Sequence, residues 1–135
     1  MTADPPSDKP LLDRLGVRPG FRVGLVGYDD AEFTALLVER GALIQQPNAG
    51  AMDLVFYLVH RPADLLSLSE LRPLIHDAGA IWVLRQKGAG RSVTDVDVID
   101  AARASDLVDN KIASFSHTLA AMRLVVPLGS RGRQT

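Results

Sequence analysis

The chain has 135 residues, of which 47% are hydrophobic and 5% aromatic, and its formal net charge at pH 7 is −1. This length predicts one domain with its own core, and the near-neutral charge provides no general field to attract nucleic acid or an anionic membrane. Because cysteine is absent from the sequence, disulfides, thiolate zinc sites and cysteine nucleophiles are excluded.

The two ends of the chain differ in composition from the middle. Residues 1–10 are polar and rich in proline, and residues 130–135 contain the short basic stretch with Arg131 and Arg133. We expect both ends to be disordered tails around one domain of residues 11–129. The start lacks the apolar core of a signal peptide, and the longest apolar run is far short of the roughly 20 residues of a membrane span. The sequence therefore predicts a soluble, cytoplasmic protein.

Strand and helix patterns alternate along the first half of the domain. The run FRVGLVG at residues 21–27 predicts a buried strand that a glycine closes. The next segment, residues 29–40, has helical spacing and ends at Gly41. Two further apolar runs predict strands at residues 42–46 and 53–60, the second being the most apolar of the chain.

The second half of the domain continues the alternation. Leucines at helical spacing between Leu65 and Ile75 predict a helix that Pro73 kinks. Thr94, followed three residues later by Asp97, predicts a capped helix start. This helix should run to about residue 107, and the remaining strands are predicted at residues 80–86, 111–116 and 122–128.

The order of these elements predicts an α/β fold, a Rossmann-like sandwich of three layers. Strands that alternate with helices form mostly parallel sheets with right-handed crossovers, here with about six strands. The last two strands are too close in sequence for a crossover helix. They should therefore form an antiparallel hairpin at one edge of the sheet.

Several segments resemble the class I S-adenosylmethionine-dependent methyltransferase fold with one strand–helix unit missing. LGVRPGFRVGLVG is similar to the entry to the first strand of these enzymes, DLVFYLVH to the fourth strand, and LRPLIHDAGAIWVL to the helix, turn and fifth strand that follow. Nearly the whole chain also resembles a bacterial family of small uncharacterised proteins, domain of unknown function 3052. The shared features there are LGVRPG, the IWV strand with Lys87 soon after it, and DLVDNKIASFS followed by MRLVVP. This second resemblance implies no activity and therefore no catalytic residue.

The methyltransferase resemblance implies a cofactor turn after the first strand, with an acid and then spaced glycines. Here Leu25 stands at the acid position, and Asp29 and Ala31 stand at the later glycine positions. The second strand should end in an acid for the ribose hydroxyls, but it ends in Gln45 and Gln46.

The acids after Gly27 give this turn a structural interpretation. Asp29 can cap the following helix, Glu32 can be its capping-box partner, and Asp30 adds a further negative charge. A carboxylate or phosphate at this helix terminus would be repelled. We therefore expect a tight turn that caps a helix, and no cofactor.

Ligands of open α/β sheets bind outside the carboxyl ends of the parallel strands. This edge is predicted to collect Tyr28, Asp29, His60, Arg61, Arg85, Lys87, Ser116 and His117. Lys111 begins its strand and should lie at the opposite edge, whereas Arg123 begins the returning strand and could rejoin the ligand edge. Tyr28 could line a crevice there or be partly buried against the sheet.

The segment best suited by composition to bind an anion is RQKGAGRSVT, residues 85–94. Its glycines let backbone amides face an anion, and its basic side chains could neutralise one. The alternative is an ordinary surface loop with solvated charges, since the P-loop pattern is absent. The residues predicted to bind a ligand are Tyr28, Lys87, Gly88, Gly90, Arg91, Thr94 and Arg123.

No catalytic or metal site is predicted. His60 and His117 fall at strand ends on the ligand edge and are weak candidates for a metal site or an acid–base pair, the alternative being two solvated loop histidines. Ser114 and Ser116 lack the GxSxG elbow of a serine nucleophile. Trp82, in a central strand, is predicted to be a core residue.

The leading hypothesis from sequence is a non-enzymatic binding or regulatory interaction module that has lost the S-adenosylmethionine motif. The missing unit should expose a sheet edge or an apolar helix face, so we predict a homodimer or another protein partner. The alternative is a divergent methyltransferase, or another transferase, that binds a nucleotide-like or phosphate-bearing small anion at the carboxyl edge. Nucleic-acid binding is the least favoured, and no membrane partner is expected.

Overall fold

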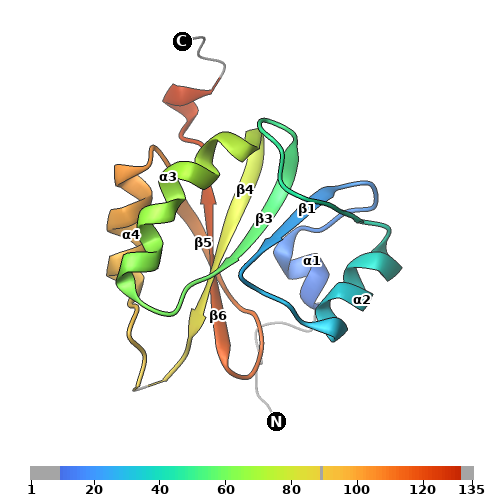
Figure 1. Cartoon of the computed structure of the whole chain (residues 1–135), viewed down its shortest axis with the longest axis horizontal. Helices are drawn as coiled ribbons and strands as arrows, with labels where there is room; N and C mark the ends of the chain where they lie inside the picture. The colour runs from blue at the N-terminus through green and yellow to red at the C-terminus, as the bar shows by residue number, and fades with distance from the viewer. Residues whose placement is uncertain (1–9, 89, 132–135) are drawn as a thin grey trace.

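Six strands form one mixed sheet in the described residues, 10–88 and 90–131, of the computed structural model (Figure 1). The sheet order is β2-β1-β3-β4-β6-β5. Neighbours from β2 to β4 pair in parallel, and β6 pairs antiparallel with both β4 and β5. This confirms the α/β, Rossmann-like fold with a mostly parallel sheet and a hairpin at one edge. The strands are β1 (Arg22–Val26), β2 (Leu43–Ile44), β3 (Met52–Leu58), β4 (Ile75–Gln86), β5 (Val108–Ser114) and β6 (Leu119–Val125).

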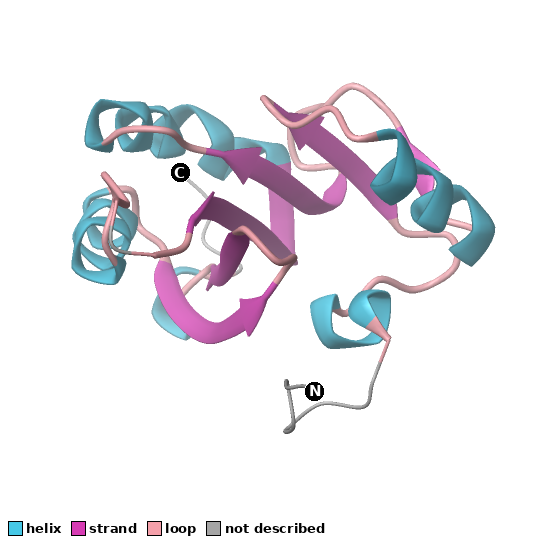
Figure 2. Cartoon of the chain, turned by 90° about the horizontal axis from the view of Figure 1, so that it is seen from below, coloured by secondary structure: helices cyan, strands magenta, loops and turns pink. Residues whose placement is uncertain are grey.

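Helices cover both faces of the sheet (Figure 2). On one face, α1 (Leu11–Leu15) and α2 (Ala31–Arg40) pack against side chains of β3 and β4 that include Phe56 and Trp82. The helical side chains buried there are Leu12, Leu15, Phe33 and Leu37. On the other face lie α4 (Asp95–Ala104) and a helical segment before β4. Because successive side chains of a strand point to opposite faces, the apolar strands β3 and β4 supply both cores.

The segment before β4 corrects the predicted helix between Leu65 and Ile75. It consists of three short pieces, the 3-10 helix Pro62–Ser67, α3 (Leu68–Leu71) and the 3-10 helix Arg72–Leu74. Pro73 has no N–H for a helical hydrogen bond, which explains why the α-helix ends before it. Ile75 then starts β4, five residues earlier than the strand predicted at residues 80–86.

The loop after β2 packs directly on β1. A Cβ atom added to Gly24 would lie 2.8 Å from Cγ of Pro47. In the methyltransferase resemblance a strand–helix unit is missing at this place, and here the loop at residues 45–51 leads straight from β2 to β3. Gly24 therefore allows a close approach of the loop to the sheet.

Helix α1 was not predicted from the sequence. Its buried side chains are Leu12 and Leu15, and Gly16 caps its end with a φ of 76°. The leucine spacing followed by a glycine is a local signal that could have identified this helix. None of the described helices is long and apolar enough to cross a membrane.

Part of the expected C-terminal tail lies against the domain. Leu128–Ser130 forms a 3-10 helix, and the Ser130 hydroxyl donates to Asp106 Oδ1 at 2.9 Å. Arg131 Nε donates to the carbonyl of Val126 at 3.1 Å. Residues 1–9, Ala89 and residues 132–135, including Arg133, lie outside the described residues.

The start of α4 confirms the predicted capping box. Asp97 N donates to Thr94 Oγ1 at 3.2 Å, and Thr94 N donates to Asp97 Oδ2 at 3.0 Å. These two bonds satisfy amide groups that have no partner inside the helix.

Replacing Thr94 with alanine is expected to lower the free energy of unfolding by about 1 kcal/mol, the usual effect of losing an N-cap side chain. Urea denaturation followed by circular dichroism measures this loss. Thr118→Ala is the matched control, because Thr118 is exposed and its side chain makes no hydrogen bond among the described residues. Equal unfolding midpoints for the two variants would show that the cap contributes nothing.

Candidate functional site

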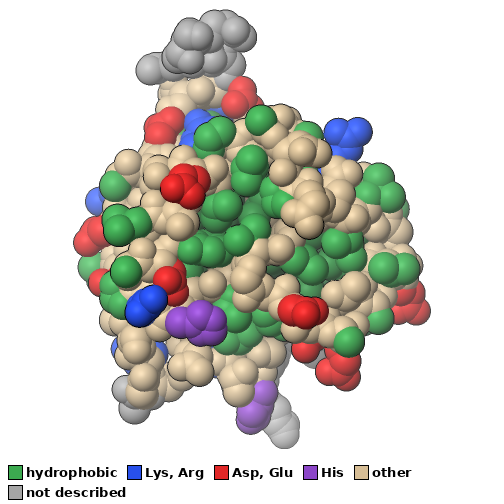
Figure 3. Space-filling model, viewed as in Figure 1, with side chains coloured by type: hydrophobic (Ala, Val, Ile, Leu, Met, Phe, Trp, Pro, Cys, Tyr) green, Lys and Arg blue, Asp and Glu red, His purple; other side chains and the backbone are tan. Residues whose placement is uncertain are grey.

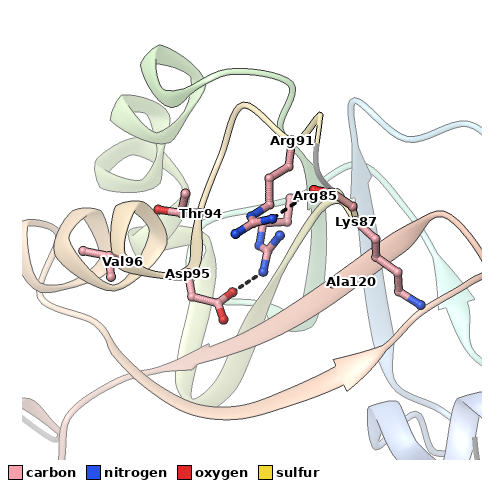
Figure 4. A pocket seen from close by; sticks show the side chains of 8 residues that line it. Arg85, Lys87, Arg91, Thr94, Asp95, Val96 and Ala120 are labelled. Carbon is pink, nitrogen blue, oxygen red and sulfur yellow. Dashed lines mark hydrogen bonds and ion pairs between the residues drawn. The ribbon is translucent and has the colours of Figure 1, made fainter.

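A cavity of about 360 Å³ lies at the carboxyl end of β4, between the loop that follows this strand and the start of α4 (Figure 4). Four of the residues that the sequence predicted for a ligand line it together. The lining residues are Arg85, Lys87, Gly88, Arg91, Thr94, Asp95, Val96 and Ala120.

Positively charged side chains outnumber negatively charged ones around this cavity. Arg85 Nη2 donates to Asp95 Oδ1, so this arginine already has a carboxylate partner. Arg91 Nη1 donates to the carbonyl of Gly88 at 2.9 Å and makes no ion pair within the described residues. Three basic side chains therefore line the cavity against one carboxylate.

Lys87 connects the cavity wall to the β5–β6 hairpin. Its Nζ donates to Ser114 Oγ and to the carbonyl of Ser116, both at 2.6 Å. Figure 4 shows that the side chain runs away from Arg85 and Arg91. Lys87 thus contributes positive charge at the rim of the cavity while it holds the start of the hairpin connection.

Tyr28 does not line this cavity and instead joins an aromatic cluster behind the β1 turn. Its ring contacts Phe33 and Phe115 edge to face, with centroid distances of 5.9 and 5.5 Å. Burial, followed by the charges of Asp30 and Glu32, raises the pKa of the Tyr28 hydroxyl. Of the two predicted alternatives, the Tyr28 side chain is therefore partly buried and does not line the cavity at the end of β4.

The structure corrects the predicted position of Arg123. Strand β6 begins at Leu119, three residues before the predicted start, so Arg123 lies within the strand and pairs with Trp82 of β4. It is therefore distant from the carboxyl end of β4, where Leu119 pairs with Gln86. Lys111 of β5 pairs with Arg123 on the far side of β6.

No group of three or more histidine, cysteine or acidic side chains able to hold a metal forms among the residues that the structure describes. The backbone N–H of His60 donates to Asp64 Oδ2 at 2.8 Å, and this bond is the main reason that the pKa of the Asp64 carboxyl is lowered.

Gly90, which the sequence also predicted for ligand binding, is not among the residues that line the cavity at the end of β4.

A carboxylate–histidine pair that the sequence analysis missed lies at the opposite edge of the sheet. Asp53 Oδ1 is 2.7 Å from His76 Nε2, and Asp53 Oδ2 accepts the backbone N–H of Arg22 at 2.7 Å. The residues are 23 positions apart. Only the pairing of β3 with β4 brings them together, so no local pattern could have revealed this pair.

The fold is similar to those of S-adenosylmethionine-dependent methyltransferases. Magnesium protoporphyrin IX methyltransferase from Synechocystis PCC 6803, solved with bound S-adenosylmethionine, gives a TM-score of 0.66 at 13% identity over 87% of this chain and 74% of that one. A methyltransferase from Aquifex aeolicus gives 0.63 at 10% identity over 86% and 88% of the two chains. A TehB-like methyltransferase from Corynebacterium glutamicum gives 0.62 at 12% identity over 87% and 85%.

These similarities, at 10–13% identity, show the fold alone, a Rossmann-like scaffold similar to that of S-adenosylmethionine-dependent methyltransferases. No protein-family model and no curated protein matches the sequence, so the resemblance to domain of unknown function 3052 is not confirmed.

The turn after β1 does not fit S-adenosylmethionine in the way that the family resemblance implies. The carboxylate of Asp30 caps α2 by accepting the N–H of Phe33 at 2.9 Å, so this helix terminus already carries an anion. The cap is Asp30 and not Asp29, because α2 begins at Ala31. Glu32 is therefore the second residue of the helix, whereas a capping-box partner would have to be the third. A ligand carboxylate would meet repulsion here.

Proposed function

We propose that the protein is a divergent methyltransferase, or another transferase on the same scaffold, that binds a nucleotide-like or phosphate-bearing ligand at the carboxyl edge of its sheet. The neighbouring folds support this proposal over the non-enzymatic module, because solved structures with this fold include methyltransferases with bound S-adenosylmethionine. The ligand would be held by the turn after β4 in place of the turn after β1.

The observation that carries the proposal is the excess of positive charge in the cavity at the end of β4. Open α/β sheets bind ligands outside the carboxyl ends of their strands, and this cavity lies there. Arg91 is the cation best placed to contact an anion, because Arg85 is neutralised by Asp95 and Lys87 is bonded to the hairpin. A guanidinium can bind a phosphate through two parallel hydrogen bonds.

Backbone geometry also favours a close approach of ligand to this turn. Gly88 has a φ of 98°, and a Cβ atom added to it would meet nothing within 4 Å. The side of the turn at Gly88 is therefore open, and a side chain there would be strained.

Ligand binding is expected to raise the unfolding temperature of the protein. S-adenosylhomocysteine, nicotinamide dinucleotides and nucleoside phosphates would each be added near 1 mM, a level that would be about 100 times the dissociation constant of a good ligand and would add roughly 2.7 kcal/mol. In a domain of this size that means a rise of several degrees. Arg91→Gln should reduce the rise, whereas Arg103→Gln, an exposed arginine in the last turn of α4, should not.

The ligands that raise the unfolding temperature decide whether the protein is a methyltransferase or another transferase. A shift with S-adenosylhomocysteine supports a methyltransferase, and a shift with nucleoside phosphates alone supports another transferase. If no compound shifts the transition, the proposal is wrong, and the non-enzymatic module becomes the better interpretation.

The homodimer stays a prediction. Apolar side chains are exposed at both edges of the sheet, on Leu43 and Ile44 of β2 and on Ile112 of β5. Figure 3 also shows hydrophobic side chains gathered in the middle of one face, between the α3–α4 layer and the α1–α2 layer. These surfaces are the places where a partner would be expected to dock.

A further inference from the structure

A second cavity, of about 250 Å³, lies on the face of the sheet that α1 covers. Three basic residues line it, Arg14 from α1, Lys111 from β5 and Arg123 from β6. The buried ring of Trp82 forms part of its wall. None of these residues belongs to the cavity at the end of β4.

Two like charges face each other across neighbouring strands in this cavity. Arg123 pairs with Trp82 on one side and with Lys111 on the other. The pairing of β5 with β6 shifts between Asp109 and Lys111, which marks a bulge at Asn110. Like charges directly opposite each other on antiparallel strands are destabilising unless an anion lies between or above them.

The neighbouring groups leave Arg123 without a counter-charge. Lys111 Nζ donates to the carbonyl of Arg14 at 2.6 Å, and Arg14 Nη1 donates to the carbonyl of Ser114 at 2.7 Å. Asp13, the one carboxylate that lines the cavity, is bonded to Arg40 at 2.8 Å.

The side chain of Arg123 makes no hydrogen bond or ion pair within residues 10–88 and 90–131, although it is partly withdrawn from water. Burial, followed by the charge of Arg131, lowers the pKa of its guanidinium. A partly buried cation without a partner is unfavourable, and a bound anion would relieve that cost.

We propose that this second cavity binds the phosphate group of a small molecule, with Arg123 as the principal contact and Lys111 beside it. A guanidinium fork and an ammonium group together match the several acceptor oxygens and the double charge of a phosphate. The cavity admits either free phosphate or a small phosphomonoester. This site is independent of the proposed function, because it uses a different face of the sheet and different side chains.

Trp82 provides the measurement, because it is the one tryptophan of the chain and lines the cavity. Inorganic phosphate and glycerol 3-phosphate would be titrated separately into the full chain at constant ionic strength, with tryptophan fluorescence and unfolding temperature recorded. We expect a saturable change with the wild type. Arg123→Met should raise the dissociation constant for phosphate at least tenfold, whereas Arg103→Gln, which changes an exposed arginine that lines neither cavity, should leave it unchanged.

Stability without phosphate separates a binding role from a structural one. At low ionic strength Arg123→Met should unfold at the same temperature as the wild type or a higher one, because it removes the repulsion from Lys111 and keeps the apolar stem. If Arg123→Met does not fold, Lys111→Gln should weaken phosphate binding instead. Tighter binding of glycerol 3-phosphate than of phosphate would identify a phosphomonoester as the ligand class, and the reverse would identify free phosphate.

The proposal is overturned by either of two results. One is the absence of any saturable response to both compounds in the wild type. The other is an equal response in the wild type, Arg123→Met and Lys111→Gln. Because Arg91→Gln is tested in parallel with the nucleotide ligands, loss of one site is distinguishable from loss of the other.

Discussion

Replacing Trp82 with alanine is expected to destabilise the protein by about 3–5 kcal/mol, the range observed when large core aromatics are truncated. Trp82 is completely buried in β4 and is the largest fully buried side chain. Its indole Nε1 donates to the carbonyl of Leu15 at 3.1 Å. The substitution therefore opens a cavity between the sheet and α1 and also removes the partner of a carbonyl at the end of that helix.

The matched variant is Trp82→Phe, which keeps most of the buried volume but loses the bond to Leu15. It should cost about 1–2 kcal/mol, clearly less than the alanine substitution. Both variants lack the single tryptophan, so unfolding in urea must be followed by circular dichroism. A loss below about 1 kcal/mol for Trp82→Ala would show that α1 does not pack on the sheet as described.

Replacing Gly79 with alanine is expected to destabilise the protein by about 3 kcal/mol, at the upper end of typical overpacking effects. Gly79 is buried in β4, and a Cβ atom added to it would lie 2.8 Å from the carbonyl oxygen of Met52 and 3.0 Å from that of Asp53. Both contacts are with the backbone of β3, which cannot move aside as a flexible side chain can.

The reason for this close approach lies in the pairing of β3 with β4. Met52 pairs with Ile75 and Leu54 with Ala80, so β4 contains extra residues between the two pairs. Gly79→Ala would force the strands apart at this irregularity. Gly129→Ala is the control, since nothing lies within 4 Å of its added Cβ atom and its backbone is not left-handed. Equal midpoints in urea denaturation for the two variants would contradict the described register.

Much of the fold follows from local patterns in the sequence. The apolar run at residues 53–60 predicted β3 within two residues, and the glycine that closes FRVGLVG predicted the end of β1 within one. Thr94 and Asp97 predicted the start of α4, because a capping box depends on side chains only three positions apart. The hairpin was predictable because too few residues separate its strands for a crossover helix.

The candidate site was predictable in part for the same reason. Lys87, Gly88, Arg91 and Thr94 lie close together in sequence, so the turn that contains them could be recognised without knowledge of the sheet. Tyr28 and Arg123 were placed at this edge only by a general rule about strand ends. Tyr28 packs on an aromatic cluster, and Arg123 lies within a strand whose start was predicted three residues too late.

By itself, then, the sequence determined the type and order of most strands and helices, because periodicity, glycines, prolines and capping residues act over a few positions. Tertiary structure alone decided the register of the strands. The early start of β4 at Ile75, the insertion of β6 between β4 and β5, and the bulge at Asn110 all depend on hydrogen bonds between distant segments. That register places Arg123 opposite Lys111 and Asp53 beside His76, because strand pairing is selected by the packing of the whole sheet and not by any local pattern.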